Sequence, residues 1–168
     1  MLIREGGWTD RMHTWLKSRR YSVAEHTWHM MALAHQLFPA DFTGNLPLAI
    51  MYHDVPERWV GDTPYTAKYI LSRQLGSALK EAEGKVSARL GIDYELTERE
   101  TAILHFCDVL EFTLWVREEL NLGNKMMEHK FKDGLAVLMK SVLWSEFEPT
   151  FIDMMATPLG EEVGWWED

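Results

Sequence analysis

The chain has 168 residues and a formal net charge of −9, from 17 basic and 26 acidic side chains, and it has one cysteine. This length predicts one domain, residues 1–168, with a substantial core. The negative charge argues against a protein that coats nucleic acid, because clustered Lys and Arg bind phosphate backbones. The lone Cys107 excludes an internal disulfide, and no apolar run reaches the roughly 18 residues of a membrane span. Arg4 and Glu5 interrupt any N-terminal apolar run, so we expect no signal peptide and predict a cytoplasmic protein.

Basic and acidic residues are unevenly distributed. Residues 1–20 carry five basic side chains against two acidic ones, and no Lys or Arg follows Lys140. The basic segment would suit a small phosphorylated ligand, and a solvated surface is the alternative interpretation. Its basic residues are Arg4, Arg11, Lys17, Arg19 and Arg20.

Helix signals begin near residue 22. Ser22-x-x-Glu25 is typical of a capping box and predicts a helix to about residue 38, ended by Pro39. A loop then leads into a second helix over about 46–55.

A third helical region is expected from Asp62 to about residue 90. Asp62 suits the N-cap, and Pro64 would stand in the first turn, where its missing N–H is harmless. We expect a break near Gly76 or Gly84.

The second half of the chain continues the helical pattern. Thr97-x-x-Glu100 is another capping box, and it predicts the longest helix, over about 98–120. A fifth helix is expected over about 125–144. Pro149 and Pro158 should bracket a short C-terminal element, followed by an acidic tail with Trp165 and Trp166. The expected fold is all-α, a bundle of about five to seven helices. The buried face of the longest helix should carry Ile103, Phe106, Leu110, Leu114 and Val116.

Ionisable residues crowd the end of the apolar second helix. His53, Asp54 and Glu57 follow the run Ile50-Met51-Tyr52. Burying them without partners would be costly, and a metal ion is one way to offset that cost. Asp108 stands among apolar residues of the longest helix, where an Asp without a partner is uncommon.

His26, His53, Asp54 and Asp108 together suit a first-row divalent metal, because two imidazoles and two carboxylates are typical ligands of Co²⁺, Mn²⁺, Zn²⁺ or Fe²⁺. His26 lies 27 residues before His53, and Asp108 lies 54 after Asp54. This order on helical segments resembles that of the HD-domain metal-dependent phosphohydrolases.

Within that superfamily the chain is most similar to the 5′-deoxynucleotidases and to the compact phage dATP triphosphohydrolases. The similarity covers roughly residues 8–120, the motif-bearing core, with the C-terminal helix and tail over 124–168. The short connecting loops favour the phage-like branch. The matching blocks are Asp10-Arg11-Met12, Ser22 to His26, Met51 to Glu57, Gly61 to Tyr69 and Asp108-x-Leu110-Glu111.

The resemblance implies roles for individual residues. His26, His53, Asp54 and Asp108 would bind one metal ion, and Glu57 would orient the attacking water or accept its proton. Arg11 and Lys68 would hold the phosphate. Asp62 would lie near the sugar or the water, in addition to its expected helix-capping role.

Two positions depart from the family pattern. Met12 stands where the nucleotidases have a Trp next to the sugar, and Trp15 or Trp59 could take its place. His105 stands where a Lys would contact phosphate, and a neutral His supplies less positive charge.

The other histidines have less specific interpretations. We expect structural or supporting roles for His29 and His35, a place at the border of the site for His13, and a solvated position for His129.

The predicted function is hydrolysis of the 5′-phosphate ester of 2′-deoxynucleotides. A monophosphatase would release deoxynucleoside and phosphate. A triphosphohydrolase, most naturally for dATP, would release triphosphate, with Lys17, Arg19 and Arg20 at the mouth of the site and an additional Mg²⁺. A non-catalytic nucleotide sensor and a purely structural oligomerisation module are the alternatives. We expect a homo-oligomer, a dimer or hexamer, in a bacterium or a phage-infected bacterium, with no nucleic-acid polymer or membrane as partner.

Overall fold

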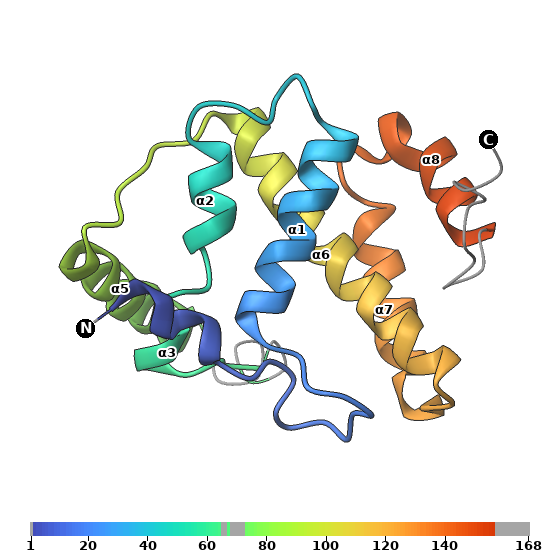
Figure 1. The fold of residues 1–168 in the computed structure, drawn as a ribbon, viewed down its shortest axis with the longest axis horizontal. Helices are drawn as coiled ribbons and strands as arrows, with labels where there is room; N and C mark the ends of the chain where they lie inside the picture. The colour runs from blue at the N-terminus through green and yellow to red at the C-terminus, as the bar shows by residue number, and fades with distance from the viewer. Residues whose placement is uncertain (1, 65–66, 68–72, 157–168) are drawn as a thin grey trace, which may run out of the picture.

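The computed structural model describes residues 2–64, 67 and 73–156 (Figure 1). The predicted all-α fold is confirmed, and the pairing of Asp10 with Ser22 is the one β-bridge within these residues. The described helices are η1 (Ile3–Trp8), α1 (Val23–Leu37), α2 (Leu46–Tyr52), α3 (Glu57–Val60), α5 (Arg73–Leu90), α6 (Glu98–Asn121), η2 (Lys125–Met127), α7 (Glu128–Leu138) and α8 (Trp144–Ala156), where η denotes a 3₁₀ helix.

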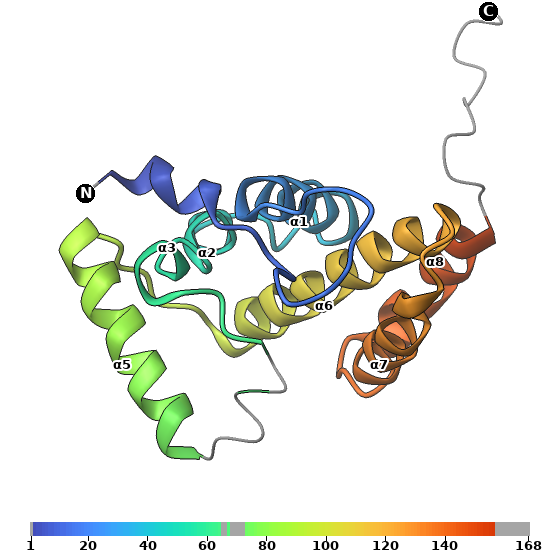
Figure 2. The ribbon, with the colours of Figure 1, turned by 90° about the horizontal axis from the view of Figure 1, so that it is seen from below.

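Helix α6 is the centre of the fold. Helices α1 and α7 pack along it, and α2 contacts both α1 and α6. Figures 1 and 2 show α5 at the edge of the molecule beside α3, on the side opposite α7 and α8. None of the described helices is long and apolar enough to cross a membrane.

The main core lies between α1, α2, α6 and α8. Residues Ile103, Phe106, Cys107 and Leu110 recur at helical spacing on α6 and are all buried, as predicted for Ile103, Phe106 and Leu110. The Phe106 ring packs edge-on against Phe147 of α8. The buried cluster comprises Met30, Ala34, Phe38, Leu46, Ile50, Ile103, Phe106, Cys107, Leu110, Leu138, Leu143 and Phe147.

Both predicted N-caps form, in different ways. At α6 the Thr97 hydroxyl accepts from the N–H of Glu100, and the Glu100 carboxylate accepts from the N–H of Thr97. At α1 the Ser22 hydroxyl accepts from the N–H of Glu25, but the Glu25 carboxylate pairs with Arg19. Half of the expected capping box therefore forms at α1.

The second helix ends earlier than predicted. Helix α2 stops at Tyr52, and residues 53–56 form a turn before the short helix α3. Pro56 has no N–H with which to continue the helical hydrogen bonds, which explains the turn. His53 and Asp54 therefore lie at the end of α2 and not inside it.

The predictions for α5 and for the C-terminal part need correction. Helix α5 runs through Gly76 and Gly84 without a break. The expected fifth helix is interrupted after α7, where the Ser141 hydroxyl accepts from the N–H of Leu143 in a turn. Pro149 does not bound an element but lies inside α8, where packing of the aromatic rings of Trp144, Phe147 and Phe151 offsets the lost hydrogen bond.

The 3₁₀ helix η1 was not predicted, and it brings the basic N-terminal segment onto the site. Gly6 of η1 lies so close to the backbone of Val55 that an added Cβ would approach its Cα to 2.9 Å. This contact places residues 8–13 beside the turn that carries His53 and Asp54. The expected features at 65–66 and 68–72, Pro158 and the Trp165–Trp166 tail lie outside the described residues.

Candidate metal centre and adjoining pocket

His26 lies at the centre of the site. It is in the first turn of α1 and has no exposed surface. Its Nε2 atom lies 3.3 Å from Nε2 of His53 and 3.2 Å from Oδ1 of Asp108. The three donor atoms of His26, His53 and Asp108 all lie within 4.8 Å of one another, a spacing that could hold a metal ion.

Asp54 joins this group from the turn after α2. Its Oδ2 atom lies 3.2 Å from Nε2 of His53 and 3.6 Å from Nε2 of His26. The structure thus brings together all four side chains that the sequence singled out as metal ligands, from α1, the end of α2 and α6. We call His26, His53, Asp54 and Asp108 the donor cluster.

Arg11 supplies positive charge where the carboxylates of the donor cluster converge. It donates a hydrogen bond to Asp54, and its Nη2 lies 3.5 Å from Oδ1 of Asp108. Burial alone would raise the pKa of Asp108, but interactions with His26 and with the Arg11 guanidinium lower it well below its usual range. The donor cluster therefore favours a cation, and its imidazole and carboxylate donors fit a divalent transition metal.

His53 presents Nε2 to the donor cluster. Its Nδ1 lies 2.8 Å from the carbonyl oxygen of Ile50, and because a carbonyl only accepts, Nδ1 carries the hydrogen. Burial lowers the pKa of His53 to about 4, although the negative charge of Asp108 alone would raise it. The neutral ring has a free lone pair on Nε2, the form of His that binds metals.

A buried group lies behind His26, and the sequence analysis named its Glu111 in a matching block without giving it a role. Nδ1 of His26 contacts the carboxylate of Glu111, which also accepts from the Tyr21 hydroxyl and lies 3.2 Å from Nδ1 of His29. Glu111 follows Asp108 by three residues, so both side chains lie on one face of α6. An acid one turn after a candidate ligand, within an apolar helix, was a signal available in the sequence. His29 has the supporting position expected for it.

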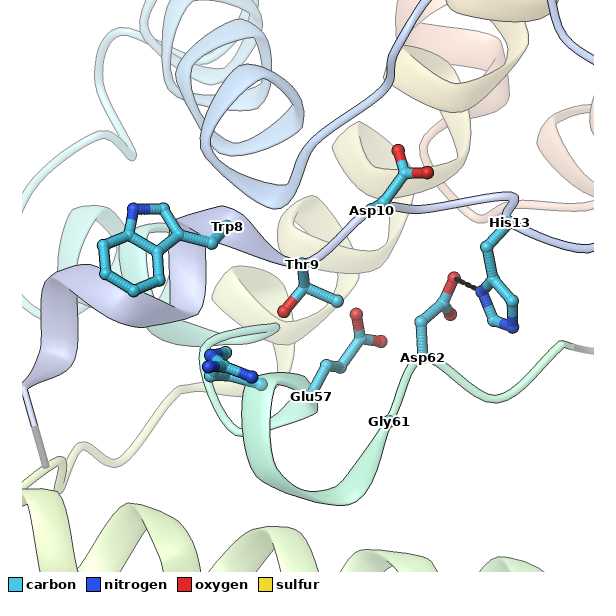
Figure 3. A pocket seen from close by; sticks show the side chains of 8 residues that line it. Trp8, Thr9, Asp10, His13, Glu57, Gly61 and Asp62 are labelled. Carbon is cyan, nitrogen blue, oxygen red and sulfur yellow. Dashed lines mark ion pairs between the residues drawn. The ribbon is translucent and has the colours of Figure 1, made fainter.

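A pocket of about 250 Å³ is lined by Glu57, three residues after Asp54 in the chain, and by Asp10, which precedes Arg11 (Figure 3). Its walls come from η1 and the segment that follows it, and from α3 and the residues after α3. The carboxylate of Asp62 lies 3.5 Å from Nδ1 of His13, which borders the pocket as expected. The residues that line the pocket are Trp8, Thr9, Asp10, His13, Glu57, Arg58, Gly61 and Asp62.

Glu57 connects the pocket with the donor cluster. It is the first residue of α3, and its carboxylate points into the space between Thr9 and Asp62 (Figure 3). Its negative charge also acts on Arg11, which contacts Asp54.

The aromatic wall of the pocket is not where the sequence suggested. Met12, with a left-handed backbone (φ 55°), packs with Trp15 against the cluster around Trp115. Trp59 is half-buried and does not line the pocket. Trp8 lines it instead, and the centroid of its exposed ring lies 5.9 Å from the guanidinium carbon of Arg4 and 6.0 Å from that of Arg58.

The other residues that the sequence analysis named lie away from the pocket or outside the described residues. His105 is exposed on α6, one turn before Asp108, and Lys68 lies outside the described residues. Cys107 is buried, and burial raises the pKa of its thiol to about 12, as befits a packing residue. His35 is exposed beside Phe42, and His129 is solvated near Asp133.

The basic residues expected at the mouth of the site have partners within the chain. The Lys17 ammonium lies 2.6 Å from Oδ1 of Asp10. Arg19 pairs with Glu25 and Glu118, and Arg20 donates to the carbonyl oxygen of Trp8 at 3.0 Å.

Comparisons with known proteins agree with this geometry. The chain is 32% identical over 128 residues to a 5′-deoxynucleotidase of Erwinia tasmaniensis, and the alignment covers 63% of this chain. It spans 65% of that relative, just under two thirds of its length. The family described as "HD domain" matches residues 9–132, which include the whole donor cluster and every residue that lines the pocket except Trp8. The predicted resemblance is thereby confirmed, and the chain belongs to the HD-domain family.

Proposed function

We propose that the protein is a metal-dependent phosphohydrolase that removes the 5′-phosphate from 2′-deoxynucleoside monophosphates. The observation that carries this proposal is the donor cluster, in which two imidazoles and two carboxylates converge beside Arg11 and a pocket. Such a set suits phosphate chemistry, because it favours a divalent cation and leaves room for an anionic ligand.

His26, His53, Asp54 and Asp108 would hold the ion, which is Co²⁺, Mn²⁺, Zn²⁺ or Fe²⁺ in this proposal. When bound, it would supply Lewis acidity toward a phosphoryl oxygen and toward the attacking water. The Nδ1 contacts of His26 and His53 leave both Nε2 atoms directed at the same point.

Arg11 and Glu57 would act on the reacting groups. Arg11 has a planar set of donors that matches phosphate oxygens, and it lies where the substrate phosphate would approach the ion. Glu57 would orient the water and accept its proton. The water oxygen bonds to phosphorus as the bond from phosphorus to O5′ breaks, and O5′ takes up a proton as deoxynucleoside leaves. The role of Lys68 stays a prediction.

The nucleoside would occupy the pocket. Trp8 offers an exposed ring for stacking against a base, in the place of the Trp that the family has at the position of Met12. Asp62 and the hydroxyl of Thr9, which is buried without a hydrogen-bond partner among the described residues, are suited to a sugar hydroxyl.

Two observations favour a monophosphate over a triphosphate. Lys17, Arg19 and Arg20, which a triphosphate would need, already contact acidic groups or a backbone carbonyl. The relative described above is named as a 5′-deoxynucleotidase.

A panel of deoxynucleotides tests the proposal. Metal-free protein would be loaded with Co²⁺ or Mn²⁺ and incubated with each dNMP, dNTP and ribonucleotide, while phosphate and triphosphate release are measured separately. We expect phosphate from dNMPs. Triphosphate release from dATP would favour the triphosphohydrolase, with its additional Mg²⁺, and binding without any release would favour a nucleotide sensor.

The single domain over 1–168, the homo-oligomeric state and the cytoplasmic location expected from the sequence stay predictions.

A further inference from the structure

Helix α6 reaches both nitrogen atoms of the His26 ring. Asp108 lies 3.2 Å from Nε2, and Glu111, one turn later on the same helix face, contacts Nδ1. Glu111 is 2% exposed, so its carboxylate is held away from water. A buried carboxylate has a large desolvation cost and is retained only where several donors satisfy it.

Three side chains hold the Glu111 carboxylate in place. Oε2 faces Nδ1 of His26 and the hydroxyl of Tyr21, and Oε1 lies 3.2 Å from Nδ1 of His29. Tyr21 is fully buried, and its ring stacks on Trp115 at 4.3 Å between centroids. Glu111 therefore has little freedom to move away from His26.

The geometry of this group supports a donor–acceptor assignment. Oε2 of Glu111 lies against Nδ1 of His26 and accepts from the Tyr21 hydroxyl. A carboxylate oxygen accepts, so the hydrogen between the ring and Glu111 is the one on Nδ1, and Nε2 keeps its lone pair on the side of His53.

We propose that Glu111 is a positioning residue, which fixes His26 with its Nδ1 hydrogen toward α6 and its Nε2 lone pair toward the metal ion. The inference rests on the metal site of the proposed function and is independent of the substrate. Carboxylates that orient a ligand His in this way contribute about 10- to 100-fold to metal affinity.

The two ligand histidines differ in how they are oriented. His53 is fixed by a backbone carbonyl, that of Ile50, which no side-chain substitution removes. His26 depends on a side chain, so its orientation can be changed by mutation. Glu111→Gln should therefore weaken metal binding while every atom of the donor cluster remains.

Glu119 provides a matched control. It is a second buried glutamate on α6, two turns beyond Glu111, and has no exposed surface. Its carboxylate accepts from the N–H of Ser18 at 2.7 Å and from the amide of Asn124 at 2.8 Å. Glu119→Gln removes a buried charge of the same kind without touching His26.

The test is a Co²⁺ competition titration against a coloured chelator, with the visible Co²⁺ spectrum and the melting temperature of the metal-free protein as parallel readouts. We expect Glu111→Gln to lower Co²⁺ affinity about 10- to 100-fold and to change the spectrum, whereas Glu119→Gln keeps both. Tyr21→Phe keeps the ring on Trp115 and should give a smaller loss. Glu111→Asp should recover part of the affinity.

Wild-type affinity in folded Glu111→Gln would overturn the inference, as would equal losses in the two glutamine variants. If Glu111→Gln does not fold, Tyr21→Phe is the deciding variant. Wild-type Co²⁺ affinity in folded Tyr21→Phe would then overturn the inference. A wild-type chain that binds Co²⁺ but releases no phosphate would contradict the proposed function alone, and a wild-type chain that binds no Co²⁺ would overturn both.

Discussion

The donor cluster and the pocket differ in how much packed helix they contain. In the donor cluster His26 lies within α1 and Asp108 within α6, two helices packed along each other in the core, and His53 and Asp54 lie in the turn after α2. The pocket is lined by η1, by the short helix α3 and by the connections that follow them. The difference indicates a division of labour, in which packed helices hold the ligand geometry and connecting segments determine what binds beside it. Substitutions in the two regions should therefore have separable effects.

The largest expected effect is the loss of a ligand from the donor cluster. Asp54→Ala should remove bound metal and reduce phosphate release to background, because one of two carboxylates that balance the ion is lost. Metal content per chain and phosphate release measure this. Full activity with no bound metal would contradict the assignment.

The next largest effect should be on turnover with the metal retained. Glu57→Ala should lower kcat about 10²- to 10⁴-fold, because the water loses its orienting carboxylate, while metal content stays at the wild-type level. Glu148→Ala, on the exposed surface of α8, is the control. An unchanged kcat in Glu57→Ala would remove that residue from the mechanism.

A moderate effect is expected in the pocket alone. Trp8→Ala should raise KM for a dNMP about 5- to 100-fold through lost stacking, with metal affinity unchanged. The control is Trp28→Ala, since Trp28 is 68% exposed against 53% for Trp8 and does not line the pocket. Equal KM values for the two variants would mean that the base binds elsewhere.

A substitution in the scaffold should change stability only. An added Cβ at Gly134 would collide with Thr113 where α7 crosses α6, so Gly134→Ala should destabilise by about 1–3 kcal/mol. Gly84→Ala, in open space on α5, should stabilise by about 0.5–1 kcal/mol through helix propensity. Denaturant unfolding compares the two, and a stabilised Gly134→Ala would show that the helices can separate without cost.

The smallest effect is expected at a surface ion-pair group. Arg99 contacts Asp41 at 2.8 and 2.9 Å and Glu146 at 3.0 Å, and its hydrogen bond lowers the pKa of Asp41. A carboxylate with a lowered pKa in the folded chain stabilises above its ordinary pKa, and this stabilisation disappears as the pH falls through the lowered value. Arg99→Ala should lower the melting temperature at pH 7 by about 1–3 °C, with a smaller difference in acid. A difference that grows in acid would contradict this sign.

The predictable parts of the molecule were those with a local signal. The caps Ser22 and Thr97 and the apolar spacing on α6 identify helices within a few residues. The four candidate ligands could be singled out because ionisable groups in apolar helices need partners. The pairing of Glu111 with His26 spans 85 positions in the chain, so only their packing across α1 and α6 reveals it.

The pocket was less predictable because it too depends on contacts between residues far apart in the chain. Trp8 lies in a short 3₁₀ helix without periodic signal, and its position depends on the close contact of Gly6 with Val55. The sequence offered Trp15 and Trp59 as equally good candidates for the aromatic wall. Pro149 was assigned to a boundary because local rules disfavour it inside a helix, and tertiary packing around Phe147 overrides them.

The most direct test of the metal centre is equilibrium dialysis of Co²⁺ into the metal-free wild-type chain and into Asp108→Asn. The substitution keeps the shape of the side chain and removes one charge from the donor cluster. We predict one Co²⁺ per wild-type chain and strongly reduced binding in the variant. Equal binding by both chains, or no saturable binding by the wild type, would contradict the account.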